Sequence, residues 1–217
     1  RDEAIRRGGY ALAMADVNND GNIDMLIGSL KETNIMFGDG KGFFKEAPAG
    51  PLTKETLVKS AIFADYLNRG QQDLILVKFV ENNSTTTDKF FSDIVYYKND
   101  GAGNFERADL FSPRIEKSDK AMPAAVADFN NDGFLDLYVG FPGRRDFTFL
   151  RRMSKERPGL QVNTIFENMK KTFDNKTSLQ LVRTGSGVNY PHSAMAYDYN
   201  LDGLMDLFVV DDSGNLS

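Results

Sequence analysis

The chain has no cysteine among its 217 residues, which excludes disulfide bonds, thiolate zinc sites and cysteine nucleophiles. It has one histidine, His192, and no nucleophile-elbow motif, so no serine triad is indicated. No apolar stretch approaches the roughly 20 residues of a transmembrane helix. The charged residues 1–7 do not resemble a signal peptide. A net charge of -5 without a long basic run argues against a nucleic-acid partner.

What the chain does contain is an internal repeat. Four segments align without gaps, and each places a nine-residue polar loop, which begins and ends on Asp, between two short apolar runs. The opening aspartates are 49, 63 and 70 residues apart, a period that fits the blades of a β-propeller with insertions in the later connections. The segments are YALAMADVNNDGNIDMLIG from Tyr10, KSAIFADYLNRGQQDLILV from Lys59, MPAAVADFNNDGFLDLYVG from Met122 and HSAMAYDYNLDGLMDLFVV from His192.

The apolar runs predict strands buried on both faces, because they are short and rich in Val, Ile, Leu, Phe and Tyr. A second repeated element follows each of the first three loops and predicts an outer hairpin. Its turn signals are Gly38-Asp39-Gly40 in the first repeat and Asn99-Asp100-Gly101 in the second. The third version lacks these glycines, and residues 165–171 could form a short helix instead. The repeat itself favours a hairpin.

Three loops have the pattern D-x-N-x-D-G-x-x-D, with carboxylate or amide oxygens at positions 1, 3, 5 and 9 and a backbone carbonyl at position 7. Such a set can wrap one hard cation, and calcium suits it better than magnesium because calcium accepts six to eight oxygens in flexible geometry. We therefore expect about three calcium ions. The predicted ligands are Asp16, Asn18, Asp20, Asn22 and Asp24 in loop 1 (residues 16–24); Asp128, Asn130, Asp132, Phe134 and Asp136 in loop 3 (residues 128–136); and Asp198, Asn200, Asp202, Leu204 and Asp206 in loop 4 (residues 198–206).

Loop 2 (residues 65–73) departs from this pattern. It keeps Asp65 and Asp73, but Leu67 and Arg69 replace the ligands at positions 3 and 5, so we expect no calcium there. We expect instead that the guanidinium of Arg69 lies between the two aspartates and replaces the ion. None of the loops is an EF-hand, because position 12 lies inside a predicted strand and is not the Glu that an EF-hand requires.

These motifs resemble the FG-GAP/VCBS repeat of integrin-like and cartilage-acidic-protein-like propellers. Residues 128–143 are similar to the family's D-x-N-x-D-G-x-x-D-L-x-V-G-x-P-G pattern, and residues 97–105 are similar to its N-D-G-x-G-x-F element. The resemblance covers residues 8–214. It implies an all-β propeller with calcium on loops inside each blade, and a role in extracellular or periplasmic binding and assembly.

The chain is expected to form one partial propeller over residues 1–217. Its blades would lie near residues 8–50, 57–112, 120–180 and, incomplete, 190–217. Full propellers of the family have about seven blades, within the range known for propellers, and this chain holds about 3.5. The remaining blades would be in a further part of the precursor, in another chain or in a second copy, and we favour the first.

A non-enzymatic interaction or scaffold module is the favoured function, because propellers present loops on two faces. The partner would be another protein or the remaining blades of the same propeller, with a glycan as a further candidate. The polar segments 80–90 and 143–158 are candidate contact loops. The second contains five arginines that could meet an acidic partner, although a solvated loop is the simpler interpretation.

Two alternatives remain open. A lectin-like propeller would bind sugar between blades against aromatic residues such as Tyr97, although no aromatic and carboxylate pair recurs in each blade. The chain could also be the non-catalytic propeller part of a larger enzyme. The weak calcium affinity of extracellular modules, on the order of 0.1–1 mM, favours an extracytoplasmic location: secreted, periplasmic or in an organelle lumen.

Overall fold

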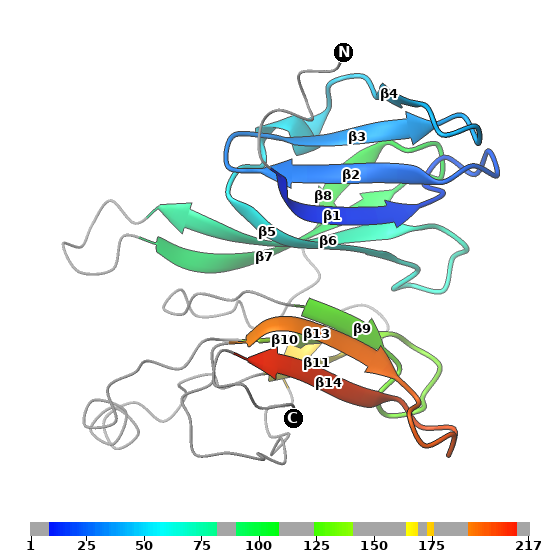
Figure 1. Cartoon of the computed structure of the whole chain (residues 1–217), viewed down its shortest axis with the longest axis vertical. Helices are drawn as coiled ribbons and strands as arrows, with labels where there is room; N and C mark the ends of the chain where they lie inside the picture. Colours follow the sequence, from blue (N-terminus) through cyan, green and yellow to red (C-terminus); the bar gives the residue numbers. More distant parts are fainter. Residues whose placement is uncertain are drawn as a thin grey trace.

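The computed structural model describes residues 9–81, 90–108, 124–140, 164–168, 173–175 and 191–211. These residues form four antiparallel sheets in which strands that follow one another in sequence are neighbours (Figure 1). We call the sheets blades 1 to 4. Among the described residues the helical structure is a single turn, η2 (Pro51–Lys54), between blades 1 and 2.

The strands of each blade follow chain order from the inner strand outward. Blade 1 contains β1 (Gly9–Ala15), β2 (Asp24–Ser29), β3 (Thr33–Gly38) and β4 (Phe44–Glu46). Blade 2 contains β5 (Val58–Ala64), β6 (Asp73–Glu81), β7 (Phe90–Asn99) and β8 (Phe105–Ala108). Blade 3 contains β9 (Ala124–Ala127), β10 (Asp136–Val139), β11 (Thr164–Asn168) and β12 (Phe173–Asn175), and blade 4 contains β13 (Pro191–Tyr197) and β14 (Asp206–Asp211).

The third outer element is a pair of strands. Phe166 pairs with Asn175 and Asn168 pairs with Phe173, so β11 and β12 are antiparallel. The alternative of a short helix over residues 165–171 is therefore wrong for the described part of this segment. Sequence propensity did not decide between the two forms, but pairing of β11 with β10 extends the sheet and satisfies its backbone groups.

The four loops are placed by strand register. In every blade the closing Asp is the first residue of the second strand, and it pairs with the residue directly before the opening Asp. These pairs are Ala15 with Asp24, Ala64 with Asp73, Ala127 with Asp136, and Tyr197 with Asp206. The nine-residue loop thus spans the end of one antiparallel strand pair, and its two terminal carboxylates start close together.

Alternation of side chains gives each blade two apolar faces. We call the face that packs on the preceding blade the upstream face, and the other the downstream face. The downstream face of blade 1, with Leu26, packs on the upstream face of blade 2, with Leu74 and Leu76. Ile75 of blade 2 packs in the same way on Leu137 of blade 3. The continuous apolar runs of the sequence are explained by this burial on both sides.

The third interface joins blades 3 and 4 through Tyr138 and Val209. The inner strands β1, β5, β9 and β13 follow one another through the structure, each near the next. The core is therefore a row of layers between successive sheets, as in the blades of a β-propeller.

Candidate metal loops

All four loops lie at the same end of the blades, on the right-hand side of Figure 1. Hydrogen bonds connect them from blade to blade. The amide of Asn19 in loop 1 donates to the carbonyl of Gly101 at 2.9 Å and to the side chain of Gln71 at 3.2 Å. The amide of Asn68 in loop 2 donates to the carbonyl of Gly133 in loop 3 at 2.8 Å.

Loop 1 is folded around its own carboxylates. Asp16 accepts the backbone N–H groups of Asp20 at 3.2 Å and Gly21 at 2.8 Å, one on each oxygen. The side-chain oxygen of Asn18 also accepts the Asp20 N–H, at 3.1 Å, and its amide donates to Asp20 at 3.0 Å. Gly21 has φ +84°, a left-handed conformation that glycine adopts without strain, which explains its place at the turn.

Loops 3 and 4 repeat this arrangement. Asp128 accepts the N–H groups of Asp132 and Gly133 at 3.0 and 2.8 Å. Asp198 accepts those of Asp202 and Gly203 at 3.1 and 2.9 Å. The Asn at position 3 again accepts the N–H of position 5, at 3.0 Å in both loops. Three loops that are far apart in the sequence therefore adopt one geometry.

The closing aspartate has a different environment from the others. Asp24 has no exposed surface, and it accepts the N–H of Val17 at 2.9 Å on one oxygen and that of Gly38 at 2.9 Å on the other. It therefore links the loop to the following strand of the outer hairpin. Asp136 and Asp206 accept the equivalent N–H groups, those of Phe129 and Tyr199, at 3.0 Å.

Loop 2 carries its own positive charge. A guanidinium nitrogen of Arg69 lies 2.6 Å from Asp73, which is fully buried. Desolvation lowers the pKa of Arg69, but the hydrogen bond and charge of Asp73 outweigh it and raise the pKa. Both oxygens of Asp65 accept backbone N–H groups, from Arg69 and Gly70. The predicted contact of Arg69 with Asp73 is present, whereas the side chain of Asp65 accepts main-chain N–H groups. That the guanidinium replaces an ion in loop 2 stays a prediction.

The electrostatics of the loops differ accordingly. In the described part of the chain, no ion pair involves the aspartates of loops 1 and 4, while loop 2 has the Arg69–Asp73 pair. The backbone N–H of Asn22 and the amide of Asn18 lower the pKa of Asp20, so this carboxylate stays charged. Like charges held so close repel one another, and a cation would relieve that repulsion.

No three carboxylate or imidazole side chains among the described residues converge closely enough to hold an ion by themselves. The predicted ligand set is mixed: carboxylates at positions 1, 5 and 9, an amide at position 3 and the main-chain carbonyl of Asn22, Phe134 or Leu204 at position 7. In loop 1 the side-chain oxygens of positions 1 and 3 both accept the N–H of position 5, and the position-5 carboxylate accepts the amide of position 3 and the N–H of position 7. Calcium ligation by all fifteen residues stays a prediction.

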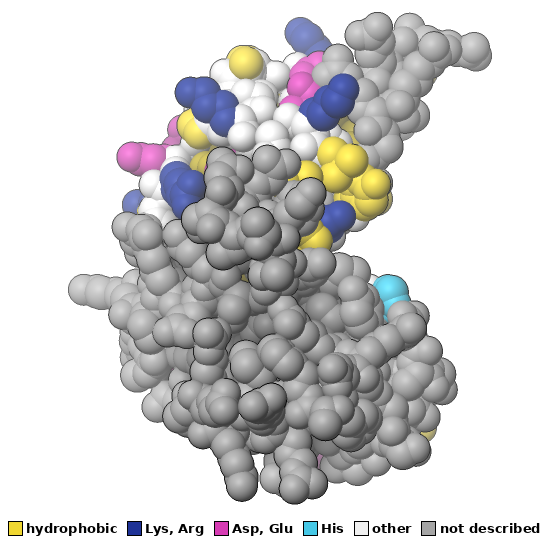
Figure 2. Space-filling view, turned by 90° about the vertical axis from the view of Figure 1, so that its left-hand side faces the viewer, with side chains coloured by type: hydrophobic (Ala, Val, Ile, Leu, Met, Phe, Trp, Pro, Cys, Tyr) yellow, Lys and Arg dark blue, Asp and Glu magenta, His cyan; other side chains and the backbone are white. Residues whose placement is uncertain are grey.

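Other sequence-predicted features lie elsewhere. His192 is exposed at the start of β13, and Figure 2 shows the single histidine (cyan) at the surface. Most of the candidate contact loop 80–90, and all of 143–158, fall outside the described residues. Lys59, in the same column of the repeat as His192, lies with its amine 4.2 Å from the ring centre of Tyr10 and 5.1 Å from that of Phe79.

Two groups of polar residues were not predicted from the sequence. The first is the position-4 column, where Asn19, Asn68 and Asn131 have φ between +51° and +59°. Their recurrence in the alignment was a usable signal, because Asn tolerates this conformation better than most residues. The position-4 residue of loop 4, Leu201, has φ +60° and no side-chain donor.

The second group surrounds Glu55, which is buried between blades 1 and 2. Glu55 pairs with Lys78 and accepts the hydroxyl of Tyr97 at 2.5 Å. Burial alone would raise the pKa of Glu55, but the contacts with Lys78 and Tyr97 and the charges of Lys78 and Arg107 lower it. Nothing in the local sequence of Glu55 marks it, since its partners are far along the chain.

Comparisons with known proteins agree with this architecture. Residues 8–76 and 80–139 match the FG-GAP-like repeat family. Cartilage acidic protein 1 of Xenopus tropicalis is 26% identical over 146 residues, which are 60% of this chain and 20% of that protein. The chain thus spans about a fifth of this curated relative.

One solved structure is similar to this chain with a TM-score of 0.54 and 16% sequence identity. The similarity covers 90% of this chain and 46% of the chain of that structure. It is a lectin of Agrocybe aegerita, described as specifically recognising non-reducing terminal N-acetylglucosamine. At this identity the likeness supports the fold alone. The described residues contain no helix that is long and apolar enough to cross a membrane.

Proposed function

Because the chain belongs to the FG-GAP-like repeat family, we propose that it is a non-enzymatic, calcium-binding β-propeller module that holds a protein partner. Calcium in loops 1, 3 and 4 would stabilise the end of each blade that carries them. Ion binding to the native state alone raises its stability by mass action.

The residues present fit such an ion. The donor set consists of oxygens, which calcium prefers, and the three loops share one hydrogen-bond geometry. A carboxylate oxygen that accepts one N–H retains a lone pair for a metal. Bound calcium would supply positive charge to three nearby aspartates. The chain's own residues fix the loop: Asp16 holds the turn, and Asp24 holds it to the outer hairpin.

The single observation that carries the proposal is Arg69. Loop 2 lacks the oxygen ligands at positions 3 and 5, and there a guanidinium occupies the side of the loop next to the closing aspartate. Loops 1 and 4 have the full set of predicted oxygen ligands, and among the described residues no lysine or arginine forms an ion pair with their aspartates. In loop 2 the guanidinium of Arg69 therefore supplies the positive charge beside the closing aspartate. In loops 1, 3 and 4 we propose that a calcium ion supplies it.

The test is calcium stoichiometry in a matched pair of variants. Native mass spectrometry of the wild type should show three bound calcium ions at saturation. Leu67→Asn with Arg69→Asp gives loop 2 the full pattern, so a fourth ion should appear. Asp132→Asn in loop 3 should remove one. Thermal unfolding in millimolar calcium against chelator should show a rise of several degrees in the wild type, absent with magnesium.

The control is Asp65→Asn, which changes an opening aspartate in the loop expected to be empty. It should leave the calcium count unchanged. A count that falls with Asp65→Asn as it does with Asp132→Asn would refute the distinction between the loops. No calcium effect on either the count or the unfolding temperature would refute the calcium proposal.

The proposed location is extracytoplasmic. Loops of this kind in extracellular modules bind calcium with dissociation constants of about 0.1–1 mM, so cytosolic calcium would not fill them. The proposed partner is a protein, because blades present loops and open faces to a neighbour. A glycan partner remains the alternative, and a glycan array in the presence of calcium would test it directly.

A further inference from the structure

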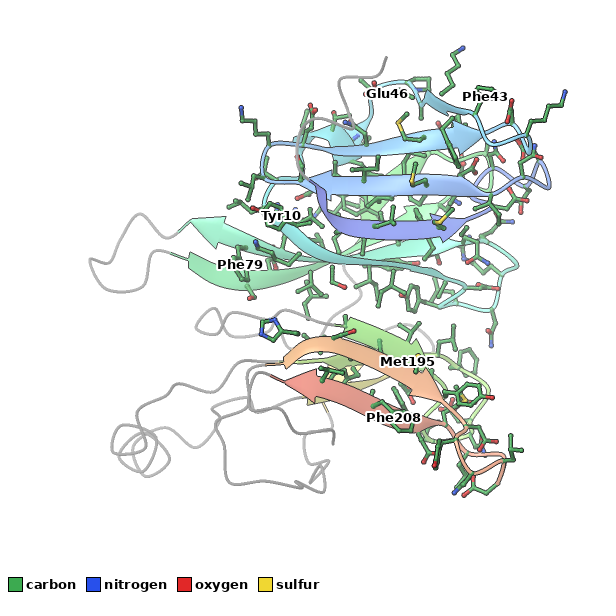
Figure 3. The ribbon with its side chains drawn as sticks, viewed as in Figure 1. Tyr10, Phe43, Glu46, Phe79, Met195 and Phe208 are labelled. Atoms are coloured by element: carbon green, nitrogen blue, oxygen red, sulfur yellow. The ribbon has the colours of Figure 1, made fainter. Side chains whose placement is uncertain are left out.

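Loop 2 is in direct contact with loop 3, and the two lie side by side at the right-hand end of the blades in Figure 3. The contact is the hydrogen bond from the amide of Asn68 to the carbonyl of Gly133, at 2.8 Å. Asn68 belongs to the loop that is expected to hold no calcium, and Gly133 belongs to a loop with the full set of predicted ligands. The bond therefore connects a loop that has its own cation with a candidate metal site.

The accepting carbonyl belongs to the peptide group that joins Gly133 and Phe134, at positions 6 and 7 of loop 3. The N–H of the same peptide group donates to the carboxylate of Asp132 at 2.9 Å. Because a peptide group is planar, these two bonds fix its orientation from both ends. Asp132 is the predicted ligand at position 5, and the carbonyl of Phe134 is the predicted ligand at position 7. The orientation of this peptide group therefore affects two of the five predicted ligands.

Loop 4 provides an internal comparison, because blade 3 precedes it as blade 2 precedes loop 3. The N–H of Leu204 donates to Asp202 at 2.8 Å, as the equivalent N–H does in loop 3. Among the residues that the structure describes, however, no hydrogen bond reaches the carbonyl of Gly203. The position-4 residue of loop 3, Asn131, has φ +59° and is equivalent to Asn68. An asparagine at this position is thus not sufficient for the bond, which is present between loops 2 and 3 and not between loops 3 and 4.

Loop 2 is held in place on both sides of Asn68 by contacts that require no metal ion. On one side the guanidinium of Arg69 lies 2.6 Å from the buried Asp73. On the other side Tyr66 is fully buried in the apolar cluster between blades 2 and 3, and Leu67 packs against the same cluster. Leu67 and Arg69 stand where the other loops have ligands. The residues that replace the ligands therefore anchor the loop.

Loop 3 is attached to the same apolar cluster. Leu135, at position 8 of the loop, packs against this cluster, and Leu137, directly after the closing aspartate, is part of it. The core therefore already sets the position of loop 3 relative to loop 2. Asn68 has φ +51°, a conformation that asparagine tolerates better than most residues, so it can donate to Gly133 without a high backbone cost.

We propose that loop 2 preorganises the calcium site of loop 3, and that Asn68 is the positioning residue through which it acts. The inference rests on the proposed binding of calcium in loop 3. A ligand set that is held in its bound arrangement before the ion arrives loses less freedom on binding. Hydrogen-bonded groups behind metal ligands commonly change the affinity by about 10–100-fold. Linkage also requires that calcium in loop 3 strengthens the contact with loop 2 by the same factor.

The experiment isolates the calcium site of loop 3. Asp20→Asn with Asp202→Asn removes a predicted ligand from each of loops 1 and 4, and calorimetric titration with calcium chloride then reports loop 3 alone. Adding Asn68→Gly keeps a residue that adopts positive φ without strain, but it removes the amide that donates to Gly133. The dissociation constant of the remaining site should rise about tenfold. The NMR signal of the Gly133 N–H, followed during titration of the chain without the two background substitutions, gives a second reading of the same constant.

Two matched controls test whether the effect is specific to this bond. Asn19→Gly removes a bond of the same kind, to the carbonyl of Gly101, and should leave the dissociation constant of loop 3 unchanged. In a background that keeps loop 4 alone, Asp20→Asn with Asp132→Asn, the change Asn68→Gly should have no effect on calcium affinity. Circular dichroism confirms that each variant is folded.

Thermal unfolding separates positioning from a general contribution to stability. If Asn68 only held blades 2 and 3 together, Asn68→Gly would lower the unfolding temperature equally in calcium and in chelator. We expect a larger loss in saturating calcium, because the variant gains less stability from the ion. An unchanged dissociation constant in the folded variant, or an equal change in the loop 4 background, overturns the positioning role and leaves calcium binding intact. If loop 3 binds no calcium even with Asn68 present, the proposed function fails and this inference fails with it.

Discussion

Removal of the Asp73 carboxylate should be among the most damaging single changes to blade 2. Asp73 has no exposed surface, and its two oxygens accept three hydrogen bonds. One oxygen accepts the N–H of Asn99 at 2.9 Å and the guanidinium of Arg69 at 2.6 Å; the other accepts the hydroxyl of Tyr96 at 2.7 Å. These donors come from the loop and from β7, so the carboxylate joins loop 2 to the outer hairpin.

The magnitude follows from which donors water can reach. In Asp73→Ala the side chain of Arg69, which is 29% exposed, regains water, but the Asn99 N–H and the Tyr96 hydroxyl stay buried. Each buried donor without a partner costs about 1–3 kcal/mol, so we expect a loss of about 3–5 kcal/mol. Asp73→Asn can still accept from Asn99 and can donate to Tyr96. It loses the charge assistance, and should cost about 1–2 kcal/mol.

Urea unfolding of the wild type and both variants would measure these differences, with the slope checked for constancy. Because loop 2 is expected to hold no calcium, the loss should be the same with calcium and with chelator. Equal costs for the two substitutions would show that the hydrogen bonds to Asn99 and Tyr96 contribute little. A cost below about 1 kcal/mol for Asp73→Ala would refute the reasoning altogether.

Two further predictions concern contacts between blades 1 and 2. The pKa of Glu55 is lowered on folding, so its pairing with Lys78 stabilises the protein above the unfolded pKa, and this stability is lost as pH falls through the folded pKa. Glu55→Gln should therefore lower the unfolding temperature at neutral pH, and the unfolding temperature of the variant should fall less steeply than that of the wild type as the pH drops below about 4.5. The same pH dependence in both proteins would contradict the stabilising role of the pair. Asn19→Gly keeps the left-handed backbone but loses the bond to Gly101, at a cost of about 0.5–1.5 kcal/mol, whereas Asn19→Ala adds backbone strain and should cost more. Chemical denaturation of both variants checks the order, and the reverse order would argue against the strain.

The sequence predicted the blades well because the repeat fixes several features at once. Period, apolar runs and turn residues agree, so even the hairpin without glycines, β11 and β12, follows from its place in the repeat. The pairing of Arg69 with Asp73 was also accessible, because the two residues are four apart and the alignment shows which ligands are missing. Local spacing and internal comparison were sufficient for these features.

Contacts between blades were less accessible. The amide of Asn99 donates to the carbonyl of Val17, 82 residues away, and Glu55 meets Tyr97 across 42 residues. Such pairs depend on how far each blade is rotated and shifted against the next, which depends on the size of the side chains in the interface. The sequence of one blade does not contain that information. The asparagines at position 4 were an exception. Their recurrence is visible in the aligned repeats, although the carbonyl groups to which their amides donate are not.

The closing aspartate of the loop motif has a structural role in addition to its predicted role as a calcium ligand. Loop 2 has lost the oxygens at positions 3 and 5, yet it keeps the closing aspartate, buried and hydrogen-bonded to β7. Asp24 has the same relation to β3 through Gly38. A buried closing aspartate in a loop that lacks the ligands at positions 3 and 5 is not explained by metal binding alone. We therefore expect Asp24→Asn to destabilise the protein in chelator as well as in calcium, whereas Asp20→Asn should destabilise it mainly in calcium. Thermal unfolding of both variants in the two buffers would decide this, and an Asp24→Asn cost that vanishes in chelator would assign the closing aspartate to the ion.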